Sequence, residues 1–314
     1  MVKIAAVQFP PIYYDLERCS ARAVEIIKDA ANEGIQCVVF PEAWLSGYPM
    51  LAWEIPPENE FGPFSSIYKR MFESSPNLKK DELRPIKSAA KEFGVVVVLG
   101  FTEQASEMSA GTLYNSVAII DADGRLLNTH RKTMPTNPER MVWGFGDGSG
   151  LKVAETAVGR VGALLCWENL MPLARTAIYA QNVEIYCAPT ADTGDNWLAS
   201  MKHIGREGSC FVVAVASAMT GEDIPADLPP HRPDEAVEGW IVPGDGIICG
   251  PLGDTIAGPM REEKGFLVAD IDLAQVREAR RIFDVVGHYS RPDIYKLTVN
   301  CEKSVPVELG NTDG

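Results

Sequence analysis

Short apolar runs alternate with amphipathic stretches in the first part of the chain. The runs KIAAVQF at 3–9 and QCVVF at 36–40 are dense in apolar residues and predict buried strands. Between them, apolar residues recur at helical spacing after Asp15, a residue type that caps helix N-termini, and Gly34 follows the last of them. The pattern therefore predicts a strand, a helix and a second strand in that order.

The same alternation continues toward the middle of the chain. A helical pattern near 82–93 has Pro85 in its first turn and Gly94 just past its end, as helix termini prefer. The run VVVVLGF at 95–101 is continuous and β-branched, which is typical of a strand covered on both faces. Two apolar runs then flank the turn DADG at 121–124 and predict a hairpin.

The second half of the chain repeats this order. A helical segment around Ile178 and a helix at 196–208 alternate with apolar runs, and a further hairpin turn, a strand and a helix follow. The runs lie at 162–166, 183–189 and 210–217, the turn at 251–254, and the last strand and helix at 265–272 and 273–283. Strands that alternate with helices predict an α/β fold. Two similar halves, each a sheet with helices on one side, would stack as a four-layer α-β-β-α sandwich.

Two segments do not fit the repeat. Residues 54–80 read as irregular and are rich in Pro, Phe and Ser, and residues 221–238 are proline-rich and acidic. Long irregular segments are usually functional or mobile, so both are candidates for interfaces or pocket rims. Neither resembles a linker. We therefore predict a single domain over residues 1–314, with a core at about 3–295 and a short polar tail.

Composition and charge narrow the function classes. The 314 residues are 46% hydrophobic and 23% charged, as in ordinary globular proteins, and the net charge is −14. Such an acidic surface repels phosphate, so nucleic acid and anionic membranes are not expected partners. The N-terminal run MVKIAAVQFPP does not resemble a signal peptide, and no apolar run is long enough to span a membrane. We therefore predict a cytoplasmic protein.

The cysteines and histidines suggest neither disulfides nor metal. Four of the seven cysteines, Cys37, Cys187, Cys210 and Cys249, lie inside apolar, strand-like runs. This placement is typical of reduced thiols that serve as small hydrophobic side chains. The chain has no CxxC pair, and its four histidines are scattered, so no zinc site is predicted.

Three polar residues stand just past the ends of strong strands. Glu42 follows QCVVFP, Lys132 ends RLLNTHRK, and Cys166 ends VGALLC. Sites in α/β sheets form at the carboxyl ends of strands, so these side chains could meet at one rim. Composition alone leaves other interpretations open: a surface carboxylate, a solvated basic pair and a core cysteine.

Four motifs decide between these interpretations. Together they closely resemble the nitrilase superfamily, and its nitrilase branch in particular. They are FPEAWLSGYP at 40–49, HRKTMPTNPERMVWGFGDG at 130–148, CWENLMPLAR at 166–175 and GHYSRPDIY at 287–295. The lysine follows the glutamate by 90 residues (132 − 42), and the cysteine follows the lysine by 34 (166 − 132). The resemblance covers nearly the whole chain and implies the α-β-β-α sandwich, in agreement with the two halves.

The resemblance also implies roles for particular residues. Cys166 would be the nucleophile, Glu42 the general base and Lys132 the cation that stabilises a tetrahedral intermediate, while the family's second glutamate matches Glu139. The implied reaction converts an organic nitrile and two waters to a carboxylic acid and ammonia through a thioimidate and a thioester. Neither a metal nor an organic cofactor is required.

The chemistry accounts for these residue types. A nitrile carbon is a weak electrophile, so the attacking group should be a thiolate, and a nearby carboxylate can take the proton of the thiol. Two carboxylates in a dry pocket each resist ionising, and an ammonium between them relieves that resistance. The backbone N–H after the cysteine is a further candidate for stabilising developing charge.

Aromatic and polar residues near these motifs are candidates for substrate binding. They are Tyr48, Trp53, Trp167, Thr190, Asp192 and Trp197, with Trp44 as a further aromatic residue close to Glu42. Aromatic side chains suit the apolar body of a nitrile. The alternative is that several of them pack in the core.

Several functions remain open. Within the family, the chain could instead be an amidase, a carbamoyl hydrolase or a cyanide-hydrolysing enzyme, although the CWEN context favours a nitrilase. A non-catalytic binding or scaffold protein on this fold would have lost part of the four-residue set. The expected partner is a small-molecule nitrile of undetermined class. The resemblance implies a homodimer or larger homo-oligomer, and the short tail argues against long filaments.

Overall fold

The computed structural model contains two β-sheets. The first has the order β13-β1-β2-β3-β4-β5 and the second β10-β11-β9-β8-β7-β6, with β12 paired to β11. Described residues are 1–54, 60–106, 111–228, 239–305 and 307. The first-sheet strands are β1 (Val2–Val7), β2 (Cys37–Val39), β3 (Val96–Gln104), β4 (Leu113–Ile120), β5 (Leu126–Arg131) and β13 (Phe266–Ile271). The second-sheet strands are β6 (Ala154–Thr156), β7 (Gly159–Ala163), β8 (Ile185–Pro189), β9 (Phe211–Val215), β10 (Ala218–Thr220), β11 (Trp240–Cys249) and β12 (Thr255–Arg261).

The two sheets share one internal plan. In each, three neighbouring strands are parallel (β1-β2-β3 and β7-β8-β9), and an antiparallel hairpin follows (β4-β5 and β11-β12). Parallel strands are covered on both faces, which is why their sequences are continuous apolar runs. The two predicted halves are thus confirmed.

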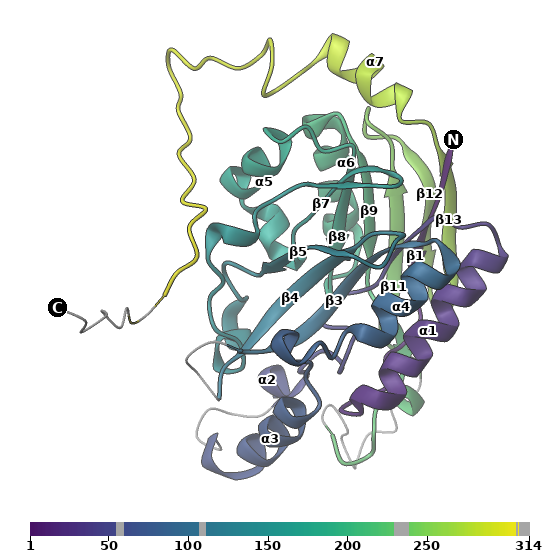
Figure 1. Cartoon of the computed structure of the whole chain (residues 1–314), viewed down its shortest axis with the longest axis vertical. Coiled ribbons are helices and arrows are strands. Elements are labelled where there is room, and N and C mark those ends of the chain that lie inside the picture. The colour runs from purple at the N-terminus through teal and green to yellow at the C-terminus, as the bar shows by residue number, and fades with distance from the viewer. Residues whose placement is uncertain (55–59, 107–110, 229–238, 306, 308–314) are drawn as a thin grey trace.

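Helices cover the outer faces of the sheets. Figure 1 shows α1 and α4 side by side on one flank of the molecule, and α5 and α6 together near another. The helices are α1 (Leu16–Asn32), α2 (Leu51–Glu54), α3 (Ser65–Glu73), α4 (Arg84–Phe93), α5 (Pro172–Tyr179), α6 (Asp195–Gly208) and α7 (Ala274–Ile282). Short 3₁₀ turns occur at Leu78–Lys80, Asn137–Met141, Gly148–Gly150, Cys166–Leu170 and Gly221–Asp223, and a π turn at Glu60–Phe64.

Three apolar clusters define four layers. One cluster joins side chains of β1 to β4 with side chains of β7, β8 and β9, so it lies between the two sheets. A second joins α1 and α4 to the first sheet, and a third joins α5 and α6 to the second. Stacked sheets with helices outside both form the predicted α-β-β-α sandwich, because each sheet buries both of its faces.

The predicted helix ends agree with the structure. The Asp15 side chain accepts a hydrogen bond from the Arg18 backbone N–H at 3.0 Å at the start of α1. At the end of α4, Gly94 has φ +68°, a left-handed conformation that favours glycine. Capping residues therefore determine where these helices begin and end.

Two details differ from the sequence predictions. The helix α3 lies within 54–80, the segment predicted to be irregular, and packs Ile67 and Met71 inward. Residues 229–238 of the other unusual segment lie outside the described part of the chain. The strand β7 ends at Ala163, so Cys166 follows the strand by a short connection and does not stand at its last position.

Two segments late in the sequence contact earlier parts of the chain. The strand β13, late in the sequence, pairs antiparallel with β1 and so completes the first sheet. After α7 the chain runs as an extended segment along the outside (Figure 1), and the Ser304 N–H donates to Asp147 at 2.7 Å. In the part of the chain that the structure describes, no helix has the length and apolar character to span a membrane.

Candidate active site

Glu42 lies in the loop that follows β2. This loop packs against β3 at Gly100, where a Cβ would come within 2.0 Å of the Pro41 carbonyl oxygen and 2.9 Å of the Glu42 Cα. Such distances are too short for any side chain, so only glycine permits this approach. The approach holds the buried Glu42 carboxylate close to the end of the first sheet.

Lys132 joins two buried carboxylates. Its Nζ donates to Glu42 Oε1 and to Glu139 Oε2, both at 2.8 Å, and its backbone N–H donates to the Asn115 carbonyl at 2.7 Å. The three charged side chains are almost inaccessible to solvent. Buried charges are tolerated only when they are paired and hydrogen-bonded, and this arrangement meets both conditions.

The electrostatics of this cluster favour proton transfer. Burial raises the pKa of Glu42, and the nearby Glu139 raises it further, while Lys132 opposes both. Burial alone would lower the pKa of Lys132, but the negative charges of Glu42 and Glu139 outweigh it and raise the pKa above its usual value. Lys132 is therefore a permanent cation beside a carboxylate of raised basicity.

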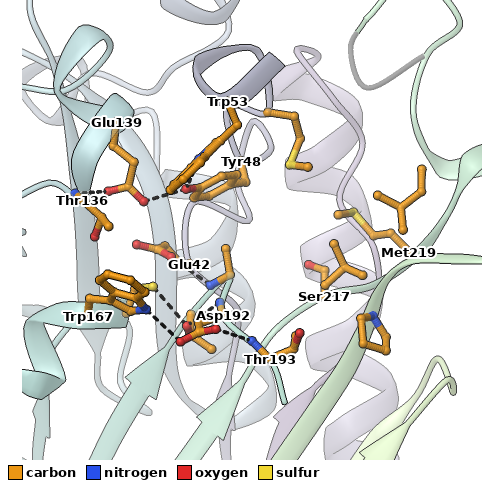
Figure 2. A pocket seen from close by; sticks show the side chains of 17 residues that line it. Glu42, Tyr48, Trp53, Thr136, Glu139, Trp167, Asp192, Thr193, Ser217 and Met219 are labelled. Carbon is orange, nitrogen blue, oxygen red and sulfur yellow. Dashed lines mark hydrogen bonds between the residues drawn. The ribbon is translucent and has the colours of Figure 1, made fainter. Parts of the chain in front are cut away.

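Glu42 and Glu139 are held by further hydrogen bonds. Asn115 Nδ2 donates to Glu42 Oε1 at 2.7 Å, and the Ala191 backbone N–H donates to Glu42 Oε2 at 2.9 Å. Tyr48 OH donates to Glu139 Oε1 at 2.6 Å, as Figure 2 shows. These bonds fix where the lone pairs of both carboxylates point.

Glu139 is also tied to its own short helix. It lies in the 3₁₀ turn Asn137–Met141, and its Oε2 accepts the Thr136 backbone N–H at 2.7 Å in a capping box. Trp53 Nε1 donates to Tyr48 OH at 2.9 Å and so extends the network to the pocket surface. The sequence fragment PTNPER therefore both starts a helical turn and presents a carboxylate to Lys132.

Cys166 begins the 3₁₀ turn Cys166–Leu170 with a φ of +47°. This left-handed conformation is uncommon for a residue with a side chain and persists only where the surroundings impose it. Asn169 imposes it here, because its Nδ2 donates to the Cys166 carbonyl at 2.8 Å and to the Leu164 carbonyl at 3.1 Å. Tyr186 OH in turn donates to Asn169 Oδ1 at 2.7 Å.

The surroundings of Cys166 favour the protonated form of its thiol. Burial raises its pKa to about 12, Glu42 and Glu139 add to the effect, and Lys132 opposes it. Thr190 Oγ1 donates to Cys166 Sγ at 3.2 Å. A reactive thiolate at this position therefore requires a base within the site, and Glu42 interacts electrostatically with this thiol.

Glu168 connects the lysine loop to the cysteine turn. Its carboxylate accepts the Thr133 backbone N–H at 2.9 Å, the Thr133 hydroxyl at 2.6 Å and the Leu165 N–H at 3.1 Å. His130 Nε2 lies 2.8 Å from Oε2, the oxygen that also accepts the Leu165 N–H, whereas both Thr133 bonds go to Oε1. Burial would raise the pKa of Glu168, but His130 and Thr133 outweigh burial and lower it to about 2.

These groups surround a pocket with a volume of about 300 Å³. Glu42, Glu139, Cys166 and Thr190 line its polar side, and Figure 2 shows Ser217 and Met219 on the opposite side. The remaining lining residues are largely apolar and include Met50, Ile241, Val242 and Pro243. The pocket is thus polar at one wall and apolar elsewhere, a common composition for small-molecule sites.

Five of the six predicted substrate-binding residues line this pocket. Tyr48, Trp53, Trp167 and Asp192 all line it, and Trp53 and Trp167 are 48% and 45% exposed. Trp167 Nε1 donates to Asp192 Oδ2 at 2.8 Å, as Figure 2 shows. Thr190 is the fifth, so the structure brings these five residues to one cavity with Cys166.

Trp197 was predicted to bind substrate, and the structure contradicts this. Its side chain is 2% exposed and packs with Leu164, Met201 and other residues of the cluster under α6. It is not among the residues that line the pocket. Trp44 is likewise buried, and its Nε1 donates to the Phe9 carbonyl at 2.8 Å. Both tryptophans are core residues.

Several site residues were missed by the sequence analysis. Asn115 and Thr136 bond to the candidate catalytic groups, and Met219 and Ile241 form the apolar wall. Glu168 bonds to Thr133 and Leu165, the neighbours of Lys132 and Cys166 in the sequence. A polar residue inside an apolar strand was a usable signal for Asn115. Within the described part of the chain, no three His, Cys, Asp or Glu side chains group as metal ligands would.

Known proteins resemble this chain along nearly its whole length. A carbon-nitrogen hydrolase family model matches residues 3–281. A bifunctional nitrilase/nitrile hydratase of Lupinus angustifolius is 39% identical over 98% of this chain and 88% of its own length. Nitrilase 2 of Arabidopsis thaliana is 38% identical over 98% of this chain and 91% of its own length.

Solved structures share the fold. A carbon-nitrogen hydrolase from Helicobacter pylori G27 has a TM-score of 0.69 at 19% identity and covers 94% of this chain and 96% of its own. A nitrilase-superfamily member of Saccharomyces cerevisiae has a TM-score of 0.68 at 18% identity, covering 92% of this chain and 96% of its own. The four-layer sandwich is therefore an arrangement that these structures have in common.

Proposed function

The chain belongs to the carbon-nitrogen hydrolase family, and we propose that it is a nitrilase that converts an organic nitrile and two waters to a carboxylic acid and ammonia. One observation carries the proposal. Cys166, held in a left-handed conformation at the base of a largely apolar pocket, lies against the buried Glu42–Lys132–Glu139 cluster. The identity to named nitrilases over nearly the whole chain supports it.

The first step joins the thiol to the nitrile. Glu42 takes the Sγ proton of Cys166, the sulfur forms a bond to the nitrile carbon, and Glu42 passes that proton to the nitrile nitrogen to give a thioimidate. Glu42 suits this role because burial raises the pKa of its carboxyl, which increases its affinity for a proton. Lys132 stabilises the negative charge that develops on nitrogen.

The remaining steps use water twice. Glu42 removes a proton from the first water, which adds to the thioimidate carbon and gives a tetrahedral intermediate. The hydroxyl proton of this intermediate passes through Glu42 to the nitrogen, which leaves as ammonia, and a thioester remains on Cys166. A second water, activated in the same way, releases the carboxylic acid and returns the thiol. Glu139 keeps Lys132 in place, since both share a 2.8 Å hydrogen bond.

The pocket favours a neutral nitrile with an apolar body. Its lining includes Met50, Met219, Ile241 and Val242, and its charged groups include the carboxylates Glu42, Glu139 and Asp192. Apolar side chains favour an aromatic or aliphatic body, and the carboxylates disfavour an anionic one. Cyanide would leave most of this volume unfilled.

A substrate panel tests the proposal. Purified protein is mixed with benzonitrile, phenylacetonitrile, an aliphatic dinitrile, cyanide and phenylacetamide, and ammonia and acid are measured against time. The proposal predicts release from at least one organic nitrile, faster than from the amide or cyanide, and no release by Cys166→Ala. Release from the amide alone would instead indicate an amidase, and release from none of them would contradict a hydrolase.

A further inference from the structure

Thr190 places a hydroxyl group directly against the reacting sulfur. It follows β8, is fully buried beside Cys166, and its Oγ1 donates to Cys166 Sγ at 3.2 Å. The same oxygen accepts the Asp192 backbone N–H at 2.8 Å. Because that N–H occupies the acceptor side of the hydroxyl, its single hydrogen is directed at the sulfur.

Two connections hold this contact in place. The chain after Thr190 leads to Asp192, whose Oδ2 accepts Trp167 Nε1 at 2.8 Å, and Trp167 directly follows Cys166. The segment 190–192 is therefore joined to the cysteine turn at two points, one at the sulfur and one at the indole. A hydroxyl held in this way does not need to reorganise when charge appears on the sulfur.

We propose that Thr190 is a catalytic residue that determines how the tetrahedral intermediate divides between a carboxylic acid and an amide. The inference rests on the proposed function, because both products would come from the same nitrile-derived intermediate. In that intermediate one carbon carries the substrate body, a hydroxyl, an amino group and Sγ.

The two routes break different bonds. In the amide route the carbon–sulfur bond breaks and its electron pair stays on sulfur as a thiolate. The hydroxyl proton passes to Glu42 and then to the thiolate, which leaves a carbonyl and an intact amide. In the acid route the carbon–nitrogen bond breaks, nitrogen takes a proton and leaves as ammonia, and the hydroxyl proton passes to Glu42. The thioester that remains is then hydrolysed by water.

At the point where the intermediate divides, Thr190 acts on only one of the two bond cleavages. Its hydrogen bond is weak to a neutral thioether sulfur and stronger to a thiolate, because charge-assisted hydrogen bonds are stronger than neutral ones. It therefore stabilises the transition state for sulfur departure and has no comparable effect on ammonia departure. The hydroxyl thus sustains amide release alongside acid release.

The amide-to-acid ratio separates this effect from changes in overall activity. Both products arise from one intermediate, so slower formation of that intermediate changes both amounts equally. A lower fraction of folded enzyme also cancels. Thr190→Val has nearly the same shape as threonine and lacks the hydroxyl, whereas Thr190→Ser keeps the donor and the acceptor for the Asp192 N–H.

The experiment measures amide and acid from the best nitrile of the panel by chromatography. Thr190→Val is expected to lower the amide-to-acid ratio by about tenfold, the effect of one hydrogen bond to a charged group. Thr190→Ser is expected to keep the ratio within about twofold of the wild-type value. If Thr190→Val forms no product, the same ratio is measured with Thr190→Ala, which also lacks the hydroxyl.

A second hydroxyl in the pocket provides the matched control. Ser217 lies on the opposite side of the cavity (Figure 2), and Ser217→Ala is expected to keep the ratio. An unchanged or higher ratio in Thr190→Val, an equal fall in Ser217→Ala, or a wild-type enzyme that forms acid with no detectable amide would each overturn the inference. If no nitrile yields either product, it is the proposed function that fails.

Discussion

Replacing Glu168 with glutamine is expected to disturb both catalytic loops at once. The carboxylate accepts two hydrogen bonds from Thr133, next to Lys132, and one from the N–H of Leu165, next to Cys166. Glu168→Gln keeps the size of the side chain but turns one oxygen into an NH₂ donor. The new NH₂ group then faces another hydrogen-bond donor, either those of Thr133 or the N–H of Leu165, inside a buried site.

The magnitude follows from the pKa of the carboxyl group. The pKa of Glu168 falls from 4.5 to about 2, because His130 and Thr133 outweigh the effect of burial. At about 1.4 kcal/mol for each unit of pKa, the ionised form contributes about 3 kcal/mol to stability at neutral pH. A lowered pKa means that this contribution is present above 4.5 and is lost as the pH falls through about 2.

Urea denaturation of wild type and Glu168→Gln at two pH values checks this reasoning. We expect the free energies of unfolding to differ by about 3 kcal/mol at about pH 7 and by about 2 kcal/mol at about pH 3.5, because only the wild-type carboxylate titrates. Ammonia release should fall about 100-fold, since both loops lose their shared anchor. A difference below about 0.5 kcal/mol at about pH 7, or an equal one at both pH values, would refute the reasoning.

Three further changes test other parts of the structure. Glu42→Gln should lower kcat/KM for ammonia release by about 10²–10⁴, because the thiol of Cys166 then lacks a base, and a loss under about tenfold would contradict that role. Gly100→Ala should lower the unfolding free energy by about 1–3 kcal/mol, since its Cβ would meet the Pro41 carbonyl. An unchanged urea midpoint would contradict this, because it would mean that the loop moves aside without loss of stability. Trp197→Phe should lower the free energy of unfolding but leave the order of preference among nitriles unchanged. A changed order in competition assays would indicate that Trp197 contacts the substrate.

Local signals in the sequence predicted most of the secondary structure. Asp15 and Gly94 mark helix ends that the structure contains, and the continuous run at 95–101 becomes a strand buried on both faces. These features depend on neighbouring residues only. The helix α3 was missed because the Pro, Phe and Ser around it obscure its short apolar face, Ile67 and Met71.

Long-range pairing was harder to predict. Strand β13 has an ordinary strand pattern, and nothing in that pattern indicates that it pairs with β1 at the other end of the sequence. Such pairing depends on how the whole first sheet assembles. Sequence periodicity reports which face of a strand is buried and does not report its neighbour.

The candidate site was predictable where residues follow strands. Glu42, Lys132 and Cys166 meet in the structure because the strands before them end on one side of the sandwich. Glu168 was missed, although it lies in the same motif as Cys166, because its partners His130 and Thr133 come from β5 and the loop after it. Trp53 and Trp197 look alike as sequence positions, yet the first lines the pocket and the second packs in the core.

Trapping the acyl-enzyme tests the central claim most directly. The protein is mixed with excess phenylacetonitrile, quenched in acid within the first turnovers, digested and analysed by mass spectrometry. The account predicts an added mass, equal to the nitrile or to its acyl group, on the peptide that contains Cys166. That mass should be absent in Cys166→Ala, which should also release no ammonia. An adduct on another cysteine, or ammonia release by Cys166→Ala at the wild-type rate, would contradict it.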